Sequence, residues 1–137
     1  LVCAGLDESV PGEARELRGR FVNLFDPELR VQQQLALTPG RQWLLLDLEA
    51  EQTRQRPVLA AGCKIRASSD NSAQQWSFDV DGVGSTPAIV LLRVPHEPRE
   101  VTLAGETLTT LSYDADENLV WVRFANTPVS RELVVKF

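Results

Sequence analysis

The chain has 137 residues, which suits one folded domain that is large enough to bury a hydrophobic core. Apolar residues make up 43% of it and charged residues 24%, which excludes a disordered or fibrous chain. The net charge of −5 argues against a nucleic-acid partner, because binding to phosphates needs clustered lysine and arginine. The longest apolar stretches, such as Trp43–Leu46 and Ala88–Leu92, are too short to cross a bilayer, so no membrane partner is expected.

The start of the chain, Leu-Val-Cys-Ala-Gly, resembles the middle of a longer polypeptide, and the chain contains no methionine. It shows no basic start followed by a hydrophobic run and a small-residue cleavage site, so no signal peptide is expected. We therefore expect a domain that belongs to a larger or processed protein.

Alternating apolar and polar residues recur along the chain with turn residues between them, which is the pattern of a β-sandwich or barrel. Strands are expected near Leu1–Ala4, Arg20–Phe25, Arg30–Leu37, Gln42–Leu48, Val58–Arg66, Gln75–Val80, Ala88–Val94, Glu100–Leu103, Thr107–Tyr113, Leu119–Ala125 and Glu132–Phe137. Proline and glycine in Asp26–Glu28 and Thr38–Gly40 favour turns. Only Asp7–Arg18 and Glu49–Arg56 could be helical, and an exposed loop suits the second segment equally because it is polar all round.

No alternation of strand, helix and strand is present, which disfavours a parallel sheet. We predict a single all-β domain over residues 1–137, an antiparallel two-sheet β-sandwich of immunoglobulin-like or jelly-roll-like type with about ten strands.

Side chains alternate between the two faces of a strand, so each expected strand provides two sets of residues. In Gln42–Leu48 the even positions are apolar and predict the core face, which leaves Trp43 and Asp47 on a mixed face. In Leu119–Ala125 the same division leaves Trp121 and Arg123 outside the core. By contrast, Trp76 shares its face with Phe78 and Val80 and is expected in the core, and Leu133, Val135 and Phe137 point inward from the last strand.

Three alternatives stay open for Trp43 and Trp121. The rings pack under a loop or into a second layer of core, or they contact a neighbouring domain of the parent chain. In the third alternative they form a platform on which a sugar stacks, while Asp47 and Arg123 bind its hydroxyl groups.

Residues suited to catalysis or metal binding are sparse. His96 lies in a turn between two prolines with no serine or cysteine motif near it in the sequence, and Asp79 and Asp81 are adjacent polar residues of one strand face. Asp81–Ser85 lacks the lysine of a phosphate-binding loop, and Asp114–Asn118 is expected to be an acidic hairpin tip rather than a calcium site. The sequence predicts no enzyme activity, no cofactor and no metal.

The two cysteines, Cys3 and Cys63, have neither the spacing nor the histidine companions of a zinc site. They form one disulfide, or both are small buried residues.

The segment Pro98–Phe137 resembles the closing strands of C-terminal β-sandwich domains in bacterial glycoside hydrolases, which also places it near carbohydrate-binding modules. The resemblance is a pattern of strands and turns in Arg99–Glu106, Leu111–Asp114, Leu119–Phe124 and Leu133–Phe137. A similar pattern occurs in Gly19–Asp26, Leu37–Gly40 and Leu46–Leu48. It implies a non-catalytic accessory domain of a larger, secreted carbohydrate-active protein, which packs on a neighbouring domain or binds a carbohydrate. The competing hypothesis is an immunoglobulin-like module for adhesion or protein–protein interaction.

Overall fold

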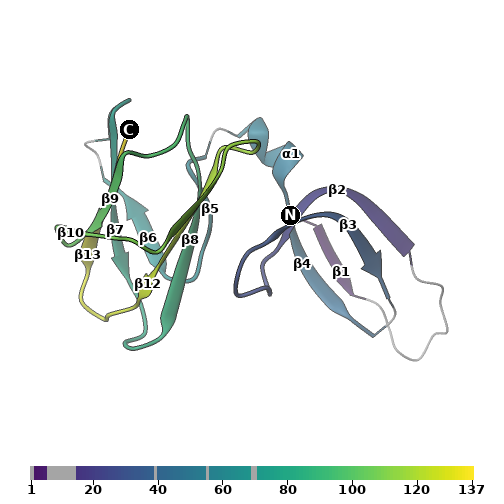
Figure 1. The fold of residues 1–137 in the computed structure, drawn as a ribbon. Helices are drawn as coiled ribbons and strands as arrows, with labels where there is room; N and C mark the ends of the chain where they lie inside the picture. Colours follow the sequence, from purple (N-terminus) through teal and green to yellow (C-terminus); the bar gives the residue numbers. More distant parts are fainter. Residues whose placement is uncertain (1, 6–14, 39, 55, 69–70) are drawn as a thin grey trace. The chain divides into compact units, whose positions relative to one another are not determined.

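The computed structural model describes residues 2–5, 15–38, 40–54, 56–68 and 71–137, and for Val2–Gly5 it describes the backbone only. The chain divides into two compact units, Leu1–Arg56 and Pro57–Phe137 (Figure 1). Every sheet in both units is antiparallel, so the predicted all-β antiparallel class is confirmed. The expectation that residues 1–137 form a single domain stays a prediction.

The first unit is one four-stranded sheet with a short helix, in the strand order β1-β4-β2-β3. Its elements are β1 (Val2–Gly5), β2 (Arg15–Asn23), β3 (Val31–Leu37), β4 (Gln42–Asp47) and α1 (Leu48–Gln52). A small hydrophobic core forms on one face of this sheet from Phe21, Leu35, Trp43 and Leu45. Of the two segments that could be helical, Glu49–Arg56 begins within α1, and the described end of Asp7–Arg18 belongs to β2.

The face of β4 that packs into this core differs from the prediction. The sequence assigned the even positions to the core, but Trp43 and Leu45 are the β4 residues of the core cluster. Leu46 and Leu48 are buried as predicted, but the burial of Trp43 was not predicted. Because β4 carries leucines on both faces, the alternation of apolar and polar residues does not distinguish them.

A glycine in β2 permits a close approach between the backbone and an aromatic ring. Gly19 has a φ of 142°, beside the point where the register of β2 against β3 shifts between Arg18 and Phe21. A Cβ atom on Gly19 would lie 2.8 Å from two ring atoms of the buried Phe21. The missing side chain is therefore required by both the backbone conformation and the packing.

The variant Gly19→Ala is expected to destabilise the first unit by about 1–3 kcal/mol, because Phe21 must shift in the small core. Denaturant unfolding in a Trp76→Phe/Trp121→Phe background measures the loss, because the remaining fluorescence then comes from Trp43 of the first unit. Gly105→Ala is the comparison, since Gly105 also has a positive φ (83°) but no atom lies within 4 Å of its added Cβ. Gly105 belongs to the second unit, so the fluorescence of Trp76 and Trp121 in a Trp43→Phe background measures its effect. An unchanged unfolding midpoint for Gly19→Ala would contradict the conclusion that this position requires glycine.

The second unit is the predicted two-sheet sandwich (Figure 1). One sheet has the order β10-β9-β13-β7-β6 and the other β11-β12-β8-β5. The strands are β5 (Val58–Ala61), β6 (Lys64–Ala67), β7 (Gln75–Asp81), β8 (Pro87–Arg93), β9 (Glu100–Leu103), β10 (Glu106–Thr107), β11 (Leu111–Asp114), β12 (Leu119–Ala125) and β13 (Arg131–Lys136).

One hydrophobic core fills the space between these two sheets. It takes Phe78 and Val80 from β7, and Leu133 and Val135 from β13, as the alternation predicted. The opposing sheet contributes Val90, Leu92, Val120 and Val122. Trp76 is half-buried and packs against this core, so its predicted side of β7 is confirmed.

Two of the expected strands are each divided between the sheets. Val58–Arg66 contains β5 in one sheet and β6 in the other, and Thr107–Tyr113 is divided in the same way between β10 and β11. Gly62 lies at the first crossing, where its N–H donates to the carbonyl of Ile89 (2.7 Å). Thr107–Tyr113 is apolar or neutral throughout, and the two charged residues of Val58–Arg66, Lys64 and Arg66, lie at its end, so the alternation carries no signal of the crossing.

Candidate functional site

The four residues expected to bind a ligand lie in different units. Trp43 and Asp47 are on β4 of the first unit, whereas Trp121 and Arg123 are on β12 of the second. Neither unit by itself contains the expected site.

Both of these indole rings are buried. Trp43 is 7% exposed as part of the core of the first unit, and Trp121 is 9% exposed. Trp121 lies on the face of β12 opposite the sandwich core, as predicted, in register with Leu91, which is fully buried. A sugar stacks on a ring whose face is open to solvent, so this burial favours the packing alternative for both rings.

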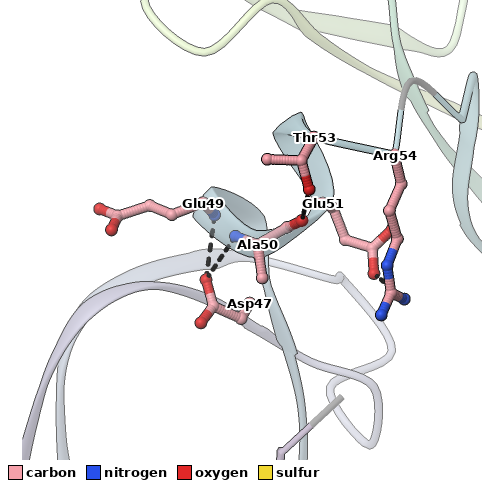
Figure 2. A network of polar contacts seen from close by, with 6 residues as sticks. All are labelled: Asp47, Glu49, Ala50, Glu51, Thr53 and Arg54. Atoms are coloured by element: carbon pink, nitrogen blue, oxygen red, sulfur yellow. Dashed lines mark hydrogen bonds and ion pairs between the residues drawn. The ribbon is translucent and has the colours of Figure 1, made fainter.

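Asp47 and Arg123 make local hydrogen bonds. Asp47 Oδ1 accepts from the N–H groups of Glu49 (3.0 Å) and Ala50 (3.1 Å), which caps the N-terminus of α1 (Figure 2). Arg123 donates from Nη1 to the hydroxyl of Ser112 on the neighbouring strand (3.0 Å). These contacts give the two side chains structural roles within their own units.

Two further polar contacts lie at the C-terminal end of α1. Arg54 Nη1 donates to Glu51 Oε1 at 2.9 Å, and the Glu51 side chain is almost fully buried (Figure 2). The hydroxyl of Thr53 donates to the carbonyl of Ala50 (2.9 Å). All of these contacts lie within the helix and its ends. The polar groups that take part therefore have hydrogen-bond partners without a ligand.

Cys63 is half-buried in the second unit, and the side chain of Cys3 lies outside the described residues, so the disulfide alternative stays a prediction. Burial raises the pKa of the Cys63 thiol, and the nearby charge of Asp81 raises it further. A thiol with a raised pKa is a poor nucleophile at neutral pH, which agrees with a structural role.

The other segments considered for chemistry are turns. Asp114–Asn118 connects β11 to β12, and Asp114 Oδ1 accepts from the N–H groups of Asp116 and Glu117, as expected of a hairpin tip. His96 is exposed. The described residues include no group of three or more His, Cys, Asp or Glu side chains that could hold a metal ion. No helix among the described residues is long and apolar enough to cross a membrane.

An open groove at one end of the sandwich brings together polar side chains from three neighbouring strands. Its volume is about 540 Å³. The residues that line it are Ser72, Gln74, Gln75, Arg99, Glu100, Lys136 and Phe137. Sequence reasoning did not identify this set as a site.

Strand register explains why these residues meet. On β13, Lys136 is in register with Gln75 of β7 on one side and with Glu100 of β9 on the other. Paired residues share a face, so the three side chains form a row across the outer face of the sheet. The row lies where β13 ends and both of its antiparallel neighbours begin.

The backbone holds the walls of the groove in place. The N–H of Phe137 donates to the carbonyl of Gln74, and the N–H of Arg99 donates to the carbonyl of Lys136, both at 2.9 Å. Ser72 Oγ accepts from the N–H groups of Gln74 (3.3 Å) and Gln75 (3.1 Å), which closes the turn before β7. The groove is therefore built on hydrogen-bonded turns and strand ends.

Aromatic rings support the groove from one side. The ring of Phe137 lies edge-on to Trp76, with centroids 4.7 Å apart, and edge-on to His96 at 5.4 Å. Phe137 itself is nearly buried. These contacts hold Phe137 in place, and the other described residues that line the groove are of polar type.

The carboxylate of Glu100 is engaged through both oxygens. Lys136 Nζ donates to Oε2 at 2.7 Å, and the hydroxyl of Thr107 donates to Oε1 at 3.3 Å. The hydrogen bond from Lys136 and its positive charge lower the pKa of Glu100, with a smaller contribution from Thr107. Glu100 therefore stays ionised at neutral pH.

Replacing Lys136 by methionine should raise the pKa of Glu100 towards its ordinary value, because both dominant causes of the lowered pKa are removed. A titration of the Glu100 side-chain carboxyl by carbon-detected NMR measures the change. Thr107→Val is the matched variant and should raise the pKa less. A pKa that is the same in wild type and Lys136→Met would show that the ion pair does not persist in solution.

Comparisons with known proteins give one likeness and no family. No family model matches the chain, and no curated protein matches it. Among solved structures, the chain is similar to a GH31 dextranase of Flavobacterium johnsoniae complexed with isomaltotriose, at 10% identity and a TM-score of 0.45. The match covers 92% of this chain and 24% of the dextranase, so the chain spans about a quarter of the length of that protein.

Proposed function

We propose that this chain is a non-catalytic β-sandwich accessory module of a larger, secreted carbohydrate-active protein, and that it binds carbohydrate in the groove at the end of the five-stranded sheet. The observation that carries the proposal is the row Gln75–Lys136–Glu100, joined in the groove by Gln74 and Arg99. Amide, carboxylate, ammonium and guanidinium groups are donors and acceptors suited to sugar hydroxyl groups.

The size and construction of the groove support a binding role. Ligand sites commonly have volumes of about 300–1,000 Å³, and the groove lies within that range. Its polar side chains come from strand ends and tight turns rather than from long loops, so little backbone entropy is lost when a ligand binds. The resemblance of the closing strands to accessory domains of glycoside hydrolases favours a carbohydrate as the ligand.

The composition of the groove also supports the absence of catalysis. Among the described residues that line it, Glu100 is the one carboxylate. Glycoside hydrolysis generally needs two carboxyl groups across the scissile bond, one of them protonated. Glu100 alone does not supply two carboxyl groups, and because Lys136 keeps it ionised it cannot act as the general acid.

Binding to a panel of immobilised and soluble oligosaccharides tests the proposal. We expect retention of the wild-type chain on at least one polysaccharide in affinity electrophoresis, and loss of that retention in Gln75→Ala and Lys136→Met. Gln33→Ala is the matched control, because Gln33 is an exposed glutamine of the first unit. Absence of binding across the panel, or binding unaffected by both groove variants, would refute a sugar role for the groove.

A second candidate function is protein–protein interaction, and it rests on a different observation. Val83 and Val129 are 75% and 71% exposed. They lie on neighbouring loops, since the N–H of Gly82 donates to the carbonyl of Thr127 (2.9 Å). These loops are at the opposite end of β13 from the groove. If the panel shows no sugar binding, a concentration-dependent association of the wild type that Val83→Ser/Val129→Ser removes would favour this candidate.

A further inference from the structure

The charges of the groove do not balance. Among the described residues that line it, Arg99, Glu100 and Lys136 are charged, which gives these residues a net formal charge of one positive unit. Lys136 and Glu100 are paired with each other at 2.7 Å. Among the lining residues, the charge of the Arg99 guanidinium is thus the one that no carboxylate of the groove offsets.

This local charge is opposite in sign to that of the chain, whose net charge is −5. An acidic protein repels anions at long range, so anionic ligands gain little from the field of the whole molecule. A positive groove on such a surface therefore attracts an anionic ligand only through direct contact. Such a groove favours a ligand whose anionic group is correctly placed over one that merely carries more negative charge.

The position of Arg99 suits contact with a carboxylate. Its backbone N–H donates to the carbonyl of Lys136, which fixes the residue at the entrance of β9. Its side chain is exposed at the groove. A guanidinium presents parallel N–H donors that match the two oxygens of a carboxylate, and such bidentate pairs are among the stronger hydrogen bonds of proteins.

The rest of the lining suits the remainder of a sugar ring. Gln74 and Gln75 offer amide donors and acceptors, and Glu100 is held in place by Lys136 and Thr107. Hydroxyl groups bind to such fixed, neutral or charge-paired groups. The groove thus combines one unpaired cationic group with several partners for hydroxyls.

From this arrangement we infer that the groove selects a carboxylate-bearing sugar, a uronate, and that Arg99 pairs with its carboxylate. This inference rests on the proposed carbohydrate-binding function and names its ligand class. Arg99 is then the residue that determines specificity, while Gln74 and Gln75 contribute to binding of acidic and neutral sugars alike.

Isothermal titration of the whole chain with oligogalacturonate and with the carboxyl-reduced form of the same oligosaccharide tests the inference. We expect the wild type to bind the acidic form about tenfold or more tightly than the neutral form, since a charge-assisted pair is gained. Arg99→Gln should make the two affinities similar, because it weakens the binding of the acidic form alone. Arg66→Gln is the matched control, because Arg66 is an exposed arginine of the same sheet away from the groove.

The outcomes separate the inference from the proposed function. Equal affinity of the wild type for the two forms, or a preference that survives Arg99→Gln, overturns the inference while carbohydrate binding stands. Failure to bind either form, together with the rest of the sugar panel, refutes both. A sulfated neutral oligosaccharide is the third ligand, and binding as tight as that of the uronate would show selection for charge and overturn the assignment of a carboxylate.

Discussion

Replacing Phe78 by alanine is expected to lower the free energy of unfolding of the sandwich by about 3–5 kcal/mol. Phe78 is the largest of the fully buried side chains, and it lies on β7 in the centre of the core between the two sheets. Its removal deletes apolar contacts and leaves a cavity that strands held by hydrogen bonds on both sides cannot close. A loss of this size is a large part of the stability of an ordinary domain.

Denaturant unfolding in a Trp43→Phe background measures this loss, because the remaining fluorescence then comes from Trp76 and Trp121 of the sandwich. Val129→Ala is the control within the same unit. Val129 is 71% exposed, so its truncation should change stability by no more than about 0.5 kcal/mol. Similar effects of the two substitutions would contradict the placement of the core.

The second large effect is expected at Gly82. A Cβ atom there would lie 2.5 Å from Oδ1 of Asn126, which is closer than real Cβ contacts allow. Asn126 is 4% exposed, and its Nδ2 donates to the carbonyl of Gly62 (3.2 Å) and to Thr86 Oγ1 (3.1 Å). The side chain therefore cannot turn away without breaking buried hydrogen bonds.

Gly82→Ala is therefore expected to cost about 2–3 kcal/mol, from the steric clash and from the weakened hydrogen bonds of Asn126. Asn126→Ala alone should cost about 1–3 kcal/mol, since it removes two part-buried hydrogen bonds. The same unfolding experiment measures both variants.

A double-mutant cycle tests whether these two costs share one cause. In the Asn126→Ala background the added methyl group of Gly82→Ala no longer meets the amide, so its cost should fall well below that in the wild type. Additive costs would show that the strain at Gly82 arises elsewhere. Gly84→Ala is a useful comparison, because its Cβ would meet only the ring of Pro128 at 3.3 Å.

Alternation of side chains was sufficient to predict much of the sandwich. It placed Trp76, Phe78 and Val80 on one side of β7, and Leu133 and Val135 on the core side of β13. These strands have one apolar and one polar face, so the pattern has a single solution. On β4, where leucines occupy both faces, the same method chose one of two buried faces and left Trp43 outside the core.

The groove could not have been predicted in the same way. It depends on the register that puts Lys136 beside Gln75 and Glu100, and these residues come from three separate parts of the chain. The pattern of a single strand contains no information on its register against distant strands. The burial of the two tryptophans could not be predicted either, because alternation predicts the side of a strand on which Trp121 lies but not what buries it.

The central claim, that the groove binds the ligand, is tested most directly by an NMR titration of the ¹⁵N-labelled chain with oligogalacturonate. We expect the largest shifts at the backbone amides of Gln74, Gln75, Arg99, Glu100 and Lys136, and at the side-chain amides of the two glutamines. The indole N–H signals of Trp43 and Trp121 should not move. Shifts of those indole signals, with the groove amides unchanged, would contradict the account and restore the tryptophan platform as the site.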